Sequence, residues 1–174
     1  MQMSKPLIKQ LQHNHISALV DGFDKSGWTE KPASTFEQYL EEQNENKRIC
    51  LVAFVKDKFA GYITLKWQSQ YSHFAKDKVP EISDLNVLPT FRKNGIGSTL
   101  IEQCEELAAT KSNLVGIGVG LYTDYGSAQK LYIKLGYTPD GYGITYDYQP
   151  VVPGNKYPMD DDLTLWLTKR LFKK

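Results

Sequence analysis

The chain has 174 residues, and its 21 basic side chains are nearly balanced by 20 acidic ones, which gives a formal charge of +1. This balance argues against a dedicated nucleic-acid binder, and a composition of 41% hydrophobic and 24% charged residues excludes wholesale disorder. No apolar run approaches the roughly 18 residues that span a bilayer. We therefore expect neither nucleic acid, because of the charge balance, nor membrane, because of the short apolar runs, as a partner. At about 150 residues per domain, residues 1–174 are expected to form one domain.

The start of the chain and its cysteines bear on the cellular compartment. No long apolar stretch follows the first charged residues, so no signal peptide is expected. Cys50 and Cys104 are too few for a disulfide scaffold and form no CxxC pair. A reducing, cytoplasmic compartment is therefore the expectation. Cys104 falls on the apolar stripe of a predicted helix, where a packed core residue is favoured over a reactive thiol.

Apolar spacing and turn residues predict six helices and strands and one loop in the first half of the chain. The second helix is expected to begin with a capping box, because Gln38 lies three residues after Thr35. Two β-rich runs flank the polar turn Lys56-Asp57-Lys58 and indicate a hairpin. In chain order the elements are a strand over 5–11, helices over 13–24 and from Ser34 to about 44–47, strands over 49–55 and 59–67, a loop over 69–79 and a strand over 81–87.

Strands and helices alternate in the second half. A helix opens at Gly95-Ile96-Gly97, and another ends at Gly136, which suits a left-handed helix cap. A central hairpin followed by strand–helix alternation predicts an α/β (α+β) fold, a mixed sheet with helices packed on it. The remaining elements are a strand over 114–119, the helix over 127–135, and strands over 144–151 and 163–171.

The most informative segment runs from Leu85 to Ser98, where a strand enters a loop that is basic and then glycine-rich, and the loop becomes the first turn of a helix. Unpaired N–H groups and the helix dipole make such a turn an anion site. Arg92 and Lys93 add positive charge, so the segment can cradle a pyrophosphate. On the glycines alone, a plain strand-to-helix turn explains it equally well. A dinucleotide fingerprint is excluded, because Leu100 stands where its third glycine belongs.

This segment resembles the signature of the GCN5-related N-acetyltransferase (GNAT) superfamily, Arg/Gln-x-x-Gly-x-Gly/Ala, here read from Arg92 to Gly97. Leu85-Asn86-Val87 looks like the family's fourth strand. The stretch from Ala128 to Tyr137 is similar to its second hallmark, a helix that ends in aromatic-x-x-x-Gly-aromatic. The resemblance implies a twisted, mainly antiparallel central sheet flanked by helices, and acetyl-CoA as co-substrate without a metal.

The resemblance also implies which residues hold the coenzyme. Backbone groups of the fourth strand would hold the pantetheine arm and polarise the acetyl carbonyl, as in other oxyanion holes. One position departs from the family pattern, because Tyr125 stands where many members have an asparagine that contacts this arm. The contact is then lost, replaced by the phenol or supplied elsewhere. The expected coenzyme-binding residues are Leu85, Asn86, Val87, Arg92, Lys93, Asn94, Gly95, Ile96, Gly97, Ser98 and Tyr125.

Two residues match catalytic roles. Tyr132 matches the family's general acid, and a phenol with a pKa near 10 can donate a proton to a leaving thiolate. Glu81 resembles a strand carboxylate that acts as a base through water. Glu81 and Asp84 lie three positions apart, so regular alternation would point them to opposite faces, with Glu81 on the face of Leu85 and Val87. A packed aromatic and a solvated carboxylate are the competing interpretations of Tyr132 and Glu81.

The resemblance therefore implies acetyl transfer from acetyl-CoA to a primary amine, on a small molecule or a peptide. Direct transfer is favoured because no cysteine is placed to carry an acetyl intermediate. Two alternatives stay open, a catalytically weak acyl-CoA sensor and a protein N-acetyltransferase. Homodimers are common in the family, so a homodimer is an open alternative for this chain. Asp160-Asp161-Asp162 is interpreted as a solvated acidic loop or as an attractor of a cationic acceptor, and His13 and His15 as surface histidines rather than metal ligands.

Overall fold

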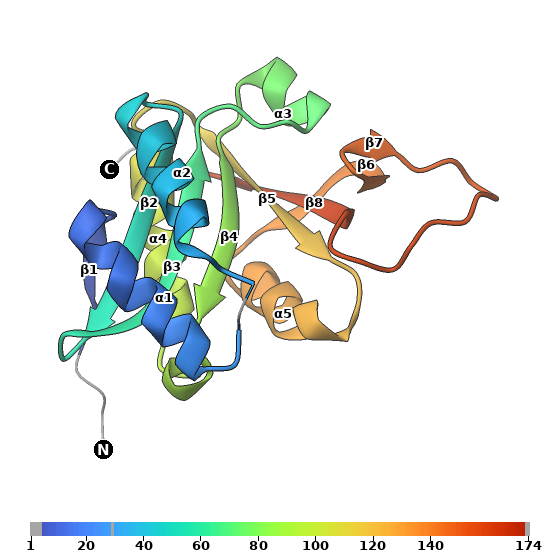
Figure 1. The fold of residues 1–174 in the computed structure, drawn as a ribbon. Helices are drawn as coiled ribbons and strands as arrows, with labels where there is room; N and C mark the ends of the chain where they lie inside the picture. The colour runs from blue at the N-terminus through green and yellow to red at the C-terminus, as the bar shows by residue number, and fades with distance from the viewer. Residues whose placement is uncertain (1–4, 29, 173–174) are drawn as a thin grey trace. The chain divides into compact units, whose positions relative to one another are not determined.

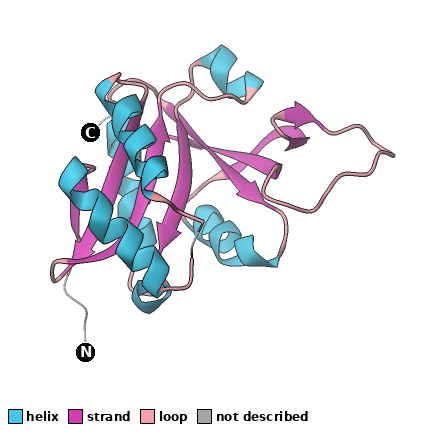
Figure 2. Ribbon diagram, viewed as in Figure 1, coloured by secondary structure: helices cyan, strands magenta, loops and turns pink. Residues whose placement is uncertain are grey.

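The computed structural model describes residues 5–28 and 30–172. Figure 1 traces the chain, and Figure 2 marks its helices and strands. The internal contacts divide the chain into two compact units, so the expectation of one domain stays a prediction. Unit 1 consists of Met1–Lys66 and Ser83–Cys104, and unit 2 consists of Trp67–Ile82 and Glu105–Lys174.

Unit 1 is built on strands in the order β1-β2-β3-β4. The pairs β1·β2 and β2·β3 are antiparallel. Lys56 and Asp57 connect β2 to β3 with φ angles of 48° and 62°, as a two-residue type I′ hairpin requires, and the predicted hairpin is confirmed. The strands are β1 (Leu7–Gln10), β2 (Arg48–Val55), β3 (Lys58–Lys66) and, from Ser83 onward, β4 (Glu81–Val87).

Helices cover the strands of unit 1, and Figure 1 shows α1 and α2 in front of β2 and β3, with the first part of α4 behind them. Phe23 of α1 is fully buried, stacks on Phe36 of α2 and meets Tyr62 of β3 edge-on. This aromatic contact ties both helices to the sheet. The helices are α1 (Ile16–Lys25), α2 (Ala33–Asn44) and, up to Cys104, α4 (Ile96–Ala109), with short 3-10 turns over His13–His15 and Pro89–Phe91.

Unit 2 contains the start of β4 and the strand order β4-β5-β8-β6-β7. The β4·β5 pair is parallel, and the pairs β5·β8, β6·β8 and β6·β7 are antiparallel. Its core includes Tyr71, whose ring stacks on Trp166 at 4.4 Å between centroids. The elements are α3 (Ser72–Asp77), β5 (Leu114–Gly120), a 3-10 turn (Thr123–Tyr125), α5 (Gly126–Lys134), β6 (Thr138–Tyr146), β7 (Gln149–Pro150) and β8 (Leu163–Arg170).

Two predictions about the first half of the chain are wrong. The helix α2 begins at Ala33 with Pro32 as its N-cap, so Thr35 lies inside the helix, and Gln38 donates to Glu42 instead of closing a capping box. The expected loop over 69–79 contains α3. Phe74 anchors this short helix by packing edge-on against Trp166, a long-range contact that local spacing does not reveal.

The predicted strand over 144–151 also needs correction. The strand β6 begins earlier, at Thr138, and ends at Tyr146. Asp147 and Tyr148 then turn the chain with φ angles of 46° and 63°, and Gln149–Pro150 pairs back on β6. The turn was hidden because an Asp-Tyr pair is not one of the usual hairpin dipeptides.

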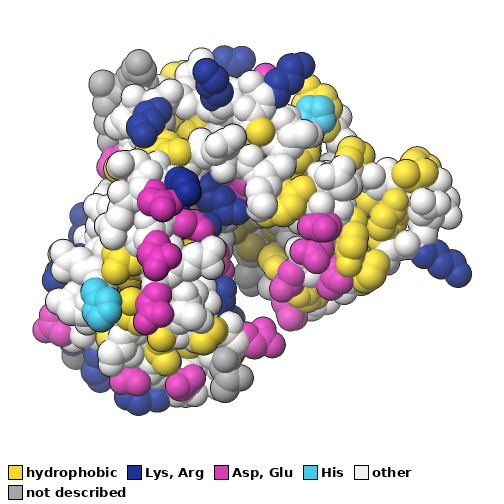
Figure 3. Space-filling view, turned by 45° about the horizontal axis from the view of Figure 1, so that its top comes forward, with side chains coloured by type: hydrophobic (Ala, Val, Ile, Leu, Met, Phe, Trp, Pro, Cys, Tyr) yellow, Lys and Arg dark blue, Asp and Glu magenta, His cyan; other side chains and the backbone are white. Residues whose placement is uncertain are grey.

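The remaining helices and strands agree with the predictions made from the sequence. The fold class is confirmed as a mixed α/β arrangement with a mainly antiparallel sheet and flanking helices. Cys104 is fully buried, and Gly136 has a φ of 92° after α5. Among the described residues, no helix is long and apolar enough to cross a membrane. Figure 3 shows both acidic and basic side chains on the face it draws.

Candidate active site

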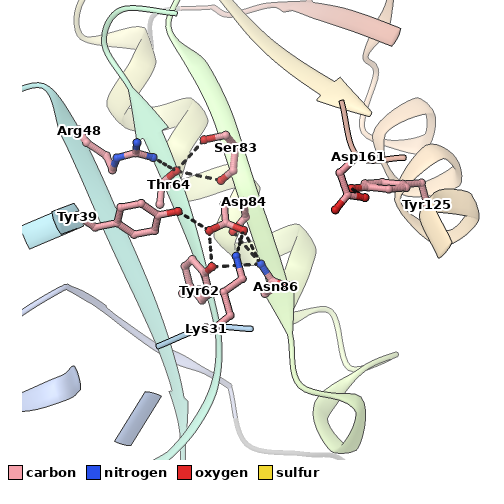
Figure 4. Close-up of polar contacts among 10 residues, drawn as sticks. All are labelled: Lys31, Tyr39, Arg48, Tyr62, Thr64, Ser83, Asp84, Asn86, Tyr125 and Asp161. Carbon is pink, nitrogen blue, oxygen red and sulfur yellow. Dashed lines mark hydrogen bonds and ion pairs between the residues drawn. The ribbon is translucent and has the colours of Figure 1, made fainter. Parts of the chain in front are cut away.

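The carboxylate of Asp84 is the centre of a polar cluster in unit 1 (Figure 4). Its Oδ1 accepts hydrogen bonds from Lys31 Nζ and Asn86 Nδ2, both at 2.8 Å. Its Oδ2 accepts from the hydroxyl of Tyr39 at 2.7 Å and from the hydroxyl of Tyr62. The Asp84 side chain is 21% exposed, so these four donors replace most of the water that a free carboxylate would bind.

A break in the regular strand conformation places Asp84. Tyr62 and Thr64 lie two positions apart on β3 and therefore share a face, yet they contact the consecutive residues Asp84 and Ser83. Asp84 has a φ of 53°, and a left-handed residue inside a strand lets two neighbouring side chains reach one face, as in a β-bulge. Regular alternation therefore does not hold through β4. Regular alternation was the only basis for placing Asp84 opposite Glu81 and Glu81 on the face of Leu85 and Val87, so that prediction loses its support.

A second polar chain supports the cluster from the α2 side. Arg48 Nε donates to Glu42 Oε2 at 2.5 Å, and its Nη1 donates to Thr64 Oγ1 at 2.9 Å. The Arg48 guanidinium also lies 4.3 Å from the centre of the Tyr39 ring. Because Arg48 contacts both α2 and β3, it fixes the ring whose hydroxyl reaches Asp84.

Burial and the neighbouring donors shift the pKa of Asp84 in opposite directions. Burial alone raises the pKa, but the charge of Lys31 and hydrogen bonds from Lys31, Tyr62 and Tyr39 outweigh it, so the pKa lies below the usual 3.8. Burial, followed by the charge of Asp84, raises the pKa of Tyr39 and Tyr62 well above the usual 10.0. At neutral pH the cluster is therefore a carboxylate, an ammonium and two protonated phenols.

The predicted coenzyme loop also lies in unit 1 and is exposed from Arg92 to Gly95. Lys93 and Gly95 have φ angles of 60° and 78°, so the chain turns sharply before α4. Arg92 Nε donates to the carbonyl of Val87 at 3.0 Å, and Asn94 Nδ2 donates to the carbonyl of Arg92 at 2.8 Å. The loop is thus fastened to the end of β4 by its own side chains.

This geometry suits an anionic group. The first N–H groups of α4, at Ile96, Gly97 and Ser98, have no partner within the helix, and the helix dipole is positive there. A Cβ atom at Gly95 would meet nothing within 4 Å, so glycine is needed at this position for its backbone angle and not for space. The exposed Arg92 and Lys93 add two cations beside these donors.

In unit 2, Tyr132 of α5 is 6% exposed, and burial raises the pKa of its hydroxyl above the usual 10.0. Its ring lies 6.2 Å from that of Tyr137. Glu81 is 3% exposed and accepts a hydrogen bond from Ser69 Oγ at 2.5 Å. Both predicted catalytic side chains are therefore buried, and Glu81 is held in place by Ser69.

Tyr125, also in unit 2, donates its hydroxyl to Asp161 Oδ1 at 2.9 Å (Figure 4), and Tyr122 donates to the same oxygen. Asp160 accepts from the hydroxyl of Tyr146 at 3.0 Å. The acidic loop is therefore linked to tyrosines and is not simply solvated. Among the described residues, no group of three or more His, Cys, Asp or Glu side chains is placed to hold a metal ion.

His13 and His15 have different surroundings in unit 1. His13 is exposed, as expected, but His15 is only 9% exposed, and its ring packs edge-on against Phe54. The expectation of a surface histidine is therefore wrong for His15. Burial, followed by the charge of Lys9, lowers its pKa.

Comparison with known families assigns this chain to a protein family. The family model described as the acetyltransferase (GNAT) family matches residues 13–137. This chain belongs to the GNAT family. The match includes the Arg92–Gly97 signature and extends to Tyr137, so the expected resemblance is confirmed, and with it the assignment as an acetyl-CoA-dependent N-acetyltransferase. No curated protein gives a significant sequence match.

Solved structures show the same GNAT fold. A ribosomal-protein-alanine N-acetyltransferase from Brucella melitensis is 21% identical, with a TM-score of 0.68 over 95% of this chain and 99% of that one. An N-acetyltransferase from Staphylococcus aureus Mu50 is 16% identical, with a TM-score of 0.71 over 97% and 100%. An aminoglycoside 6′-N-acetyltransferase complexed with coenzyme A is 21% identical, with a TM-score of 0.67 over 97% and 98%.

The sequence did not reveal the cluster around Asp84 in this GNAT chain. Lys31, Tyr39 and Tyr62 come from the segment before α2, from α2 and from β3, so no local motif joins them. The only available signal was the residue type, since aspartate tolerates the left-handed conformation better than most residues. The glycine loop was found because its parts are consecutive in sequence.

We expect Asp84→Asn to lower the free energy of unfolding at pH 7 by on the order of 1–3 kcal/mol, because it removes the charge that these hydrogen bonds stabilise. The Asp84 pKa is lower in the folded state than in the unfolded state, so its stabilisation is present above the unfolded-state value near 3.9 and is lost as the pH falls further. The deficit of the variant should therefore shrink between about pH 5 and pH 3.

Urea unfolding at pH 7, 5 and 3 measures this difference. Asp57→Asn, in the exposed β2–β3 turn, is the matched control and should show no comparable deficit at pH 7. A deficit for Asp84→Asn that stays constant down to pH 3 would contradict the assigned direction of the pKa shift.

Proposed function

We propose that this GNAT enzyme transfers acetyl from acetyl-CoA to a primary amine by direct attack within a ternary complex. An acetyl-cysteine intermediate is disfavoured because Cys50 and Cys104 are both fully buried, and burial raises the pKa of Cys50. The acceptor is an amine of a small molecule or of a peptide. The similar structures include enzymes named for aminoglycoside and for ribosomal-protein acetylation, which supports both classes.

One observation carries this proposal, namely the anion-suited turn between β4 and α4. Acetyl-CoA supplies the acetyl thioester when bound, and its pyrophosphate matches the N–H groups of Ile96, Gly97 and Ser98 together with the Arg92 and Lys93 cations. Lys93 and Gly95 already have the backbone angles that open this turn, so little ordering is needed on binding.

The end of β4 would hold the rest of the coenzyme. Backbone groups of Leu85, Asn86 and Val87 are proposed to bind the pantetheine arm and to polarise the acetyl carbonyl. The Val87 carbonyl already accepts a hydrogen bond from Arg92. The same arginine therefore links the strand expected to hold the reacting end to the loop expected to hold the phosphates. Tyr125 stays a proposed coenzyme contact, although its proton is donated to Asp161.

The test is release of free thiol from acetyl-CoA by the purified protein with a panel of amines, aminoglycosides and peptides with free N-termini or lysines. Thiol release that requires both an acceptor and the protein, with the acetyl-amine detected by mass spectrometry, is the expected result. Tight coenzyme binding by calorimetry without transfer to any acceptor would instead favour an acyl-CoA sensor.

Tyr132 is proposed as the general acid. Its raised pKa keeps the phenol protonated across the working pH range. A protonated phenol can give its proton to a leaving thiolate.

Tyr132→Phe should lower kcat by about 10²-fold or more while leaving the Kd of acetyl-CoA nearly unchanged, because only the proton donor is removed. Stopped-flow thiol release and calorimetry measure the two quantities. Tyr157→Phe, in the loop after β7, offers a matched loss of a phenol hydroxyl elsewhere and should keep the wild-type kcat. A wild-type kcat in Tyr132→Phe would remove this residue from the mechanism.

Glu81 is proposed as the base that receives the amine proton through water. Its carboxylate is held by Ser69, whose Oγ in turn accepts from the backbone N–H of Tyr71 at 3.0 Å. A base fixed in this way keeps its orientation, and any general base must be unprotonated to accept a proton.

Glu81→Gln should therefore lower kcat/KM at neutral pH by about 10²-fold and flatten the acid limb of the pH–rate profile. Ser69→Ala, which removes the support and keeps the carboxylate, should cause a smaller loss and retain the acid limb. If Glu81→Gln keeps the wild-type acid limb, Glu81 is not the base.

A further inference from the structure

The structure shows a primary ammonium bound in the Asp84 cluster, and that ammonium belongs to the chain itself. Lys31 Nζ lies 2.8 Å from Asp84 Oδ1 and 5.8 Å from the centre of the Tyr62 ring. A carboxylate and an aromatic face are the two groups that recognise alkylammonium ions in proteins. We call Asp84, Tyr39, Tyr62 and Asn86 the ammonium pocket.

The residues of the pocket lie on regular elements, whereas its present occupant does not. Asp84 and Asn86 belong to β4 and Tyr62 to β3, and the Tyr39 ring is fixed by Arg48. Lys31 precedes α2 outside any helix or strand, and its side chain is 26% exposed. A lysine has a flexible four-carbon stem and a strongly hydrated head, so Lys31 can leave the pocket for water without moving either strand.

The protons of the pocket are arranged for a cation. Both Tyr39 and Tyr62 donate their hydroxyl protons to Asp84, and so does the amide of Asn86. These donors are therefore committed to the carboxylate, and the group left facing Lys31 Nζ is an acceptor with a ring face beside it. An anion would be repelled here, and a neutral hydroxyl would gain a hydrogen bond without the charge attraction that an ammonium gains.

The position of the pocket in the chain points to the acceptor. Asp84 directly precedes Leu85, the first residue of the segment proposed to hold the reacting end of the coenzyme. We propose that the pocket binds an alkylammonium group of the acceptor, and that Lys31 is a tethered competitor which the acceptor displaces. This inference rests on the proposed function and narrows its acceptor to amines carried on an alkyl chain, as in diamines or lysine side chains.

A tethered competitor has a measurable consequence. The apparent Kd of an external ligand is its intrinsic Kd divided by the fraction of molecules in which the pocket is free. If Lys31 occupies the pocket nine-tenths of the time, removing its side chain strengthens external binding about tenfold. If the ion pair is purely structural, removing the Lys31 side chain should not strengthen binding of an external ligand. The loss of the ion pair would then only loosen the segment before α2.

The experiment titrates n-butylammonium chloride, which reproduces the Lys31 side chain, into wild-type protein and Lys31→Ala at constant ionic strength by calorimetry. The expected result is a Kd for Lys31→Ala that is about tenfold or more below that of wild type. Adding Asp84→Asn to Lys31→Ala should abolish this binding, and 1-butanol should not bind. Equal or weaker binding of butylammonium by Lys31→Ala overturns the proposal.

A control variant separates displacement of Lys31 from the general effect of removing an ion-paired lysine. Lys47→Ala removes another ion-paired lysine, which lies 2.5 Å from Glu45 and is 69% exposed, and should keep the wild-type Kd. If Lys31→Ala does not fold, wild-type protein with 13C-labelled lysine provides the test. Butylammonium should then move the Lys31 Cε resonance toward that of a solvated lysine, and an unmoved resonance at 100-fold excess over the protein refutes displacement.

The binding assay needs no coenzyme, so the two proposals fail separately. Tighter butylammonium binding by Lys31→Ala, without thiol release from acetyl-CoA on any amine, would overturn the proposed direct transfer to a primary amine and support the ammonium pocket. Thiol release on alkylamines with a KM that is not lowered in Lys31→Ala would support the transferase activity and overturn the role of Lys31.

Discussion

The left-handed conformation of Asp84 is the constraint on which the polar centre of unit 1 depends. A non-glycine residue at a φ of 53° costs on the order of 1–2 kcal/mol. Four hydrogen bonds to its carboxylate offset this cost. The bulge in turn brings Ser83 and Asp84 to the same face, where β3 supplies Thr64 and Tyr62. Without it, one of these two contacts would be lost.

Close packing of the backbone makes the bulge possible. A Cβ atom at Gly61 would lie 2.5 Å from the carbonyl oxygen of Asn86, so only glycine lets β3 approach β4 at this level. The neighbouring Tyr62 can then reach Asp84 with its hydroxyl while its ring stays in the aromatic core with Phe23 and Phe36. The core and the polar cluster therefore share the side chain of Tyr62. A change in packing at Phe23 would shift Tyr62 and so disturb its hydrogen bond to Asp84.

What the sequence could predict was set by the range of the interactions. The Arg92–Gly97 loop, the β2–β3 hairpin and the end of α5 at Gly136 depend on neighbouring residues, and all three were predicted. The short helix α3 is held by Phe74 against Trp166, and the Asp84 cluster joins four separate segments, so neither has a local pattern. The parity argument about Glu81 and Asp84 failed for the same reason, because a bulge is stabilised by partners on another strand.

The chemistry of Asp84 also separates binding from proton transfer. The charge and hydrogen bond of the bound ammonium, Lys31 in this structure, together with hydrogen bonds from Tyr62 and Tyr39, keep the pKa of Asp84 below its usual value. The carboxylate in turn stabilises the protonated form of the amine that it binds. A carboxylate of this kind binds a cation well and accepts a proton poorly. Asp84 is therefore suited to anchor the acceptor, and the proton that an attacking amine must lose has to go to another base. On this argument a GNAT site with a strongly hydrogen-bonded carboxylate still needs a second one, the role proposed for Glu81.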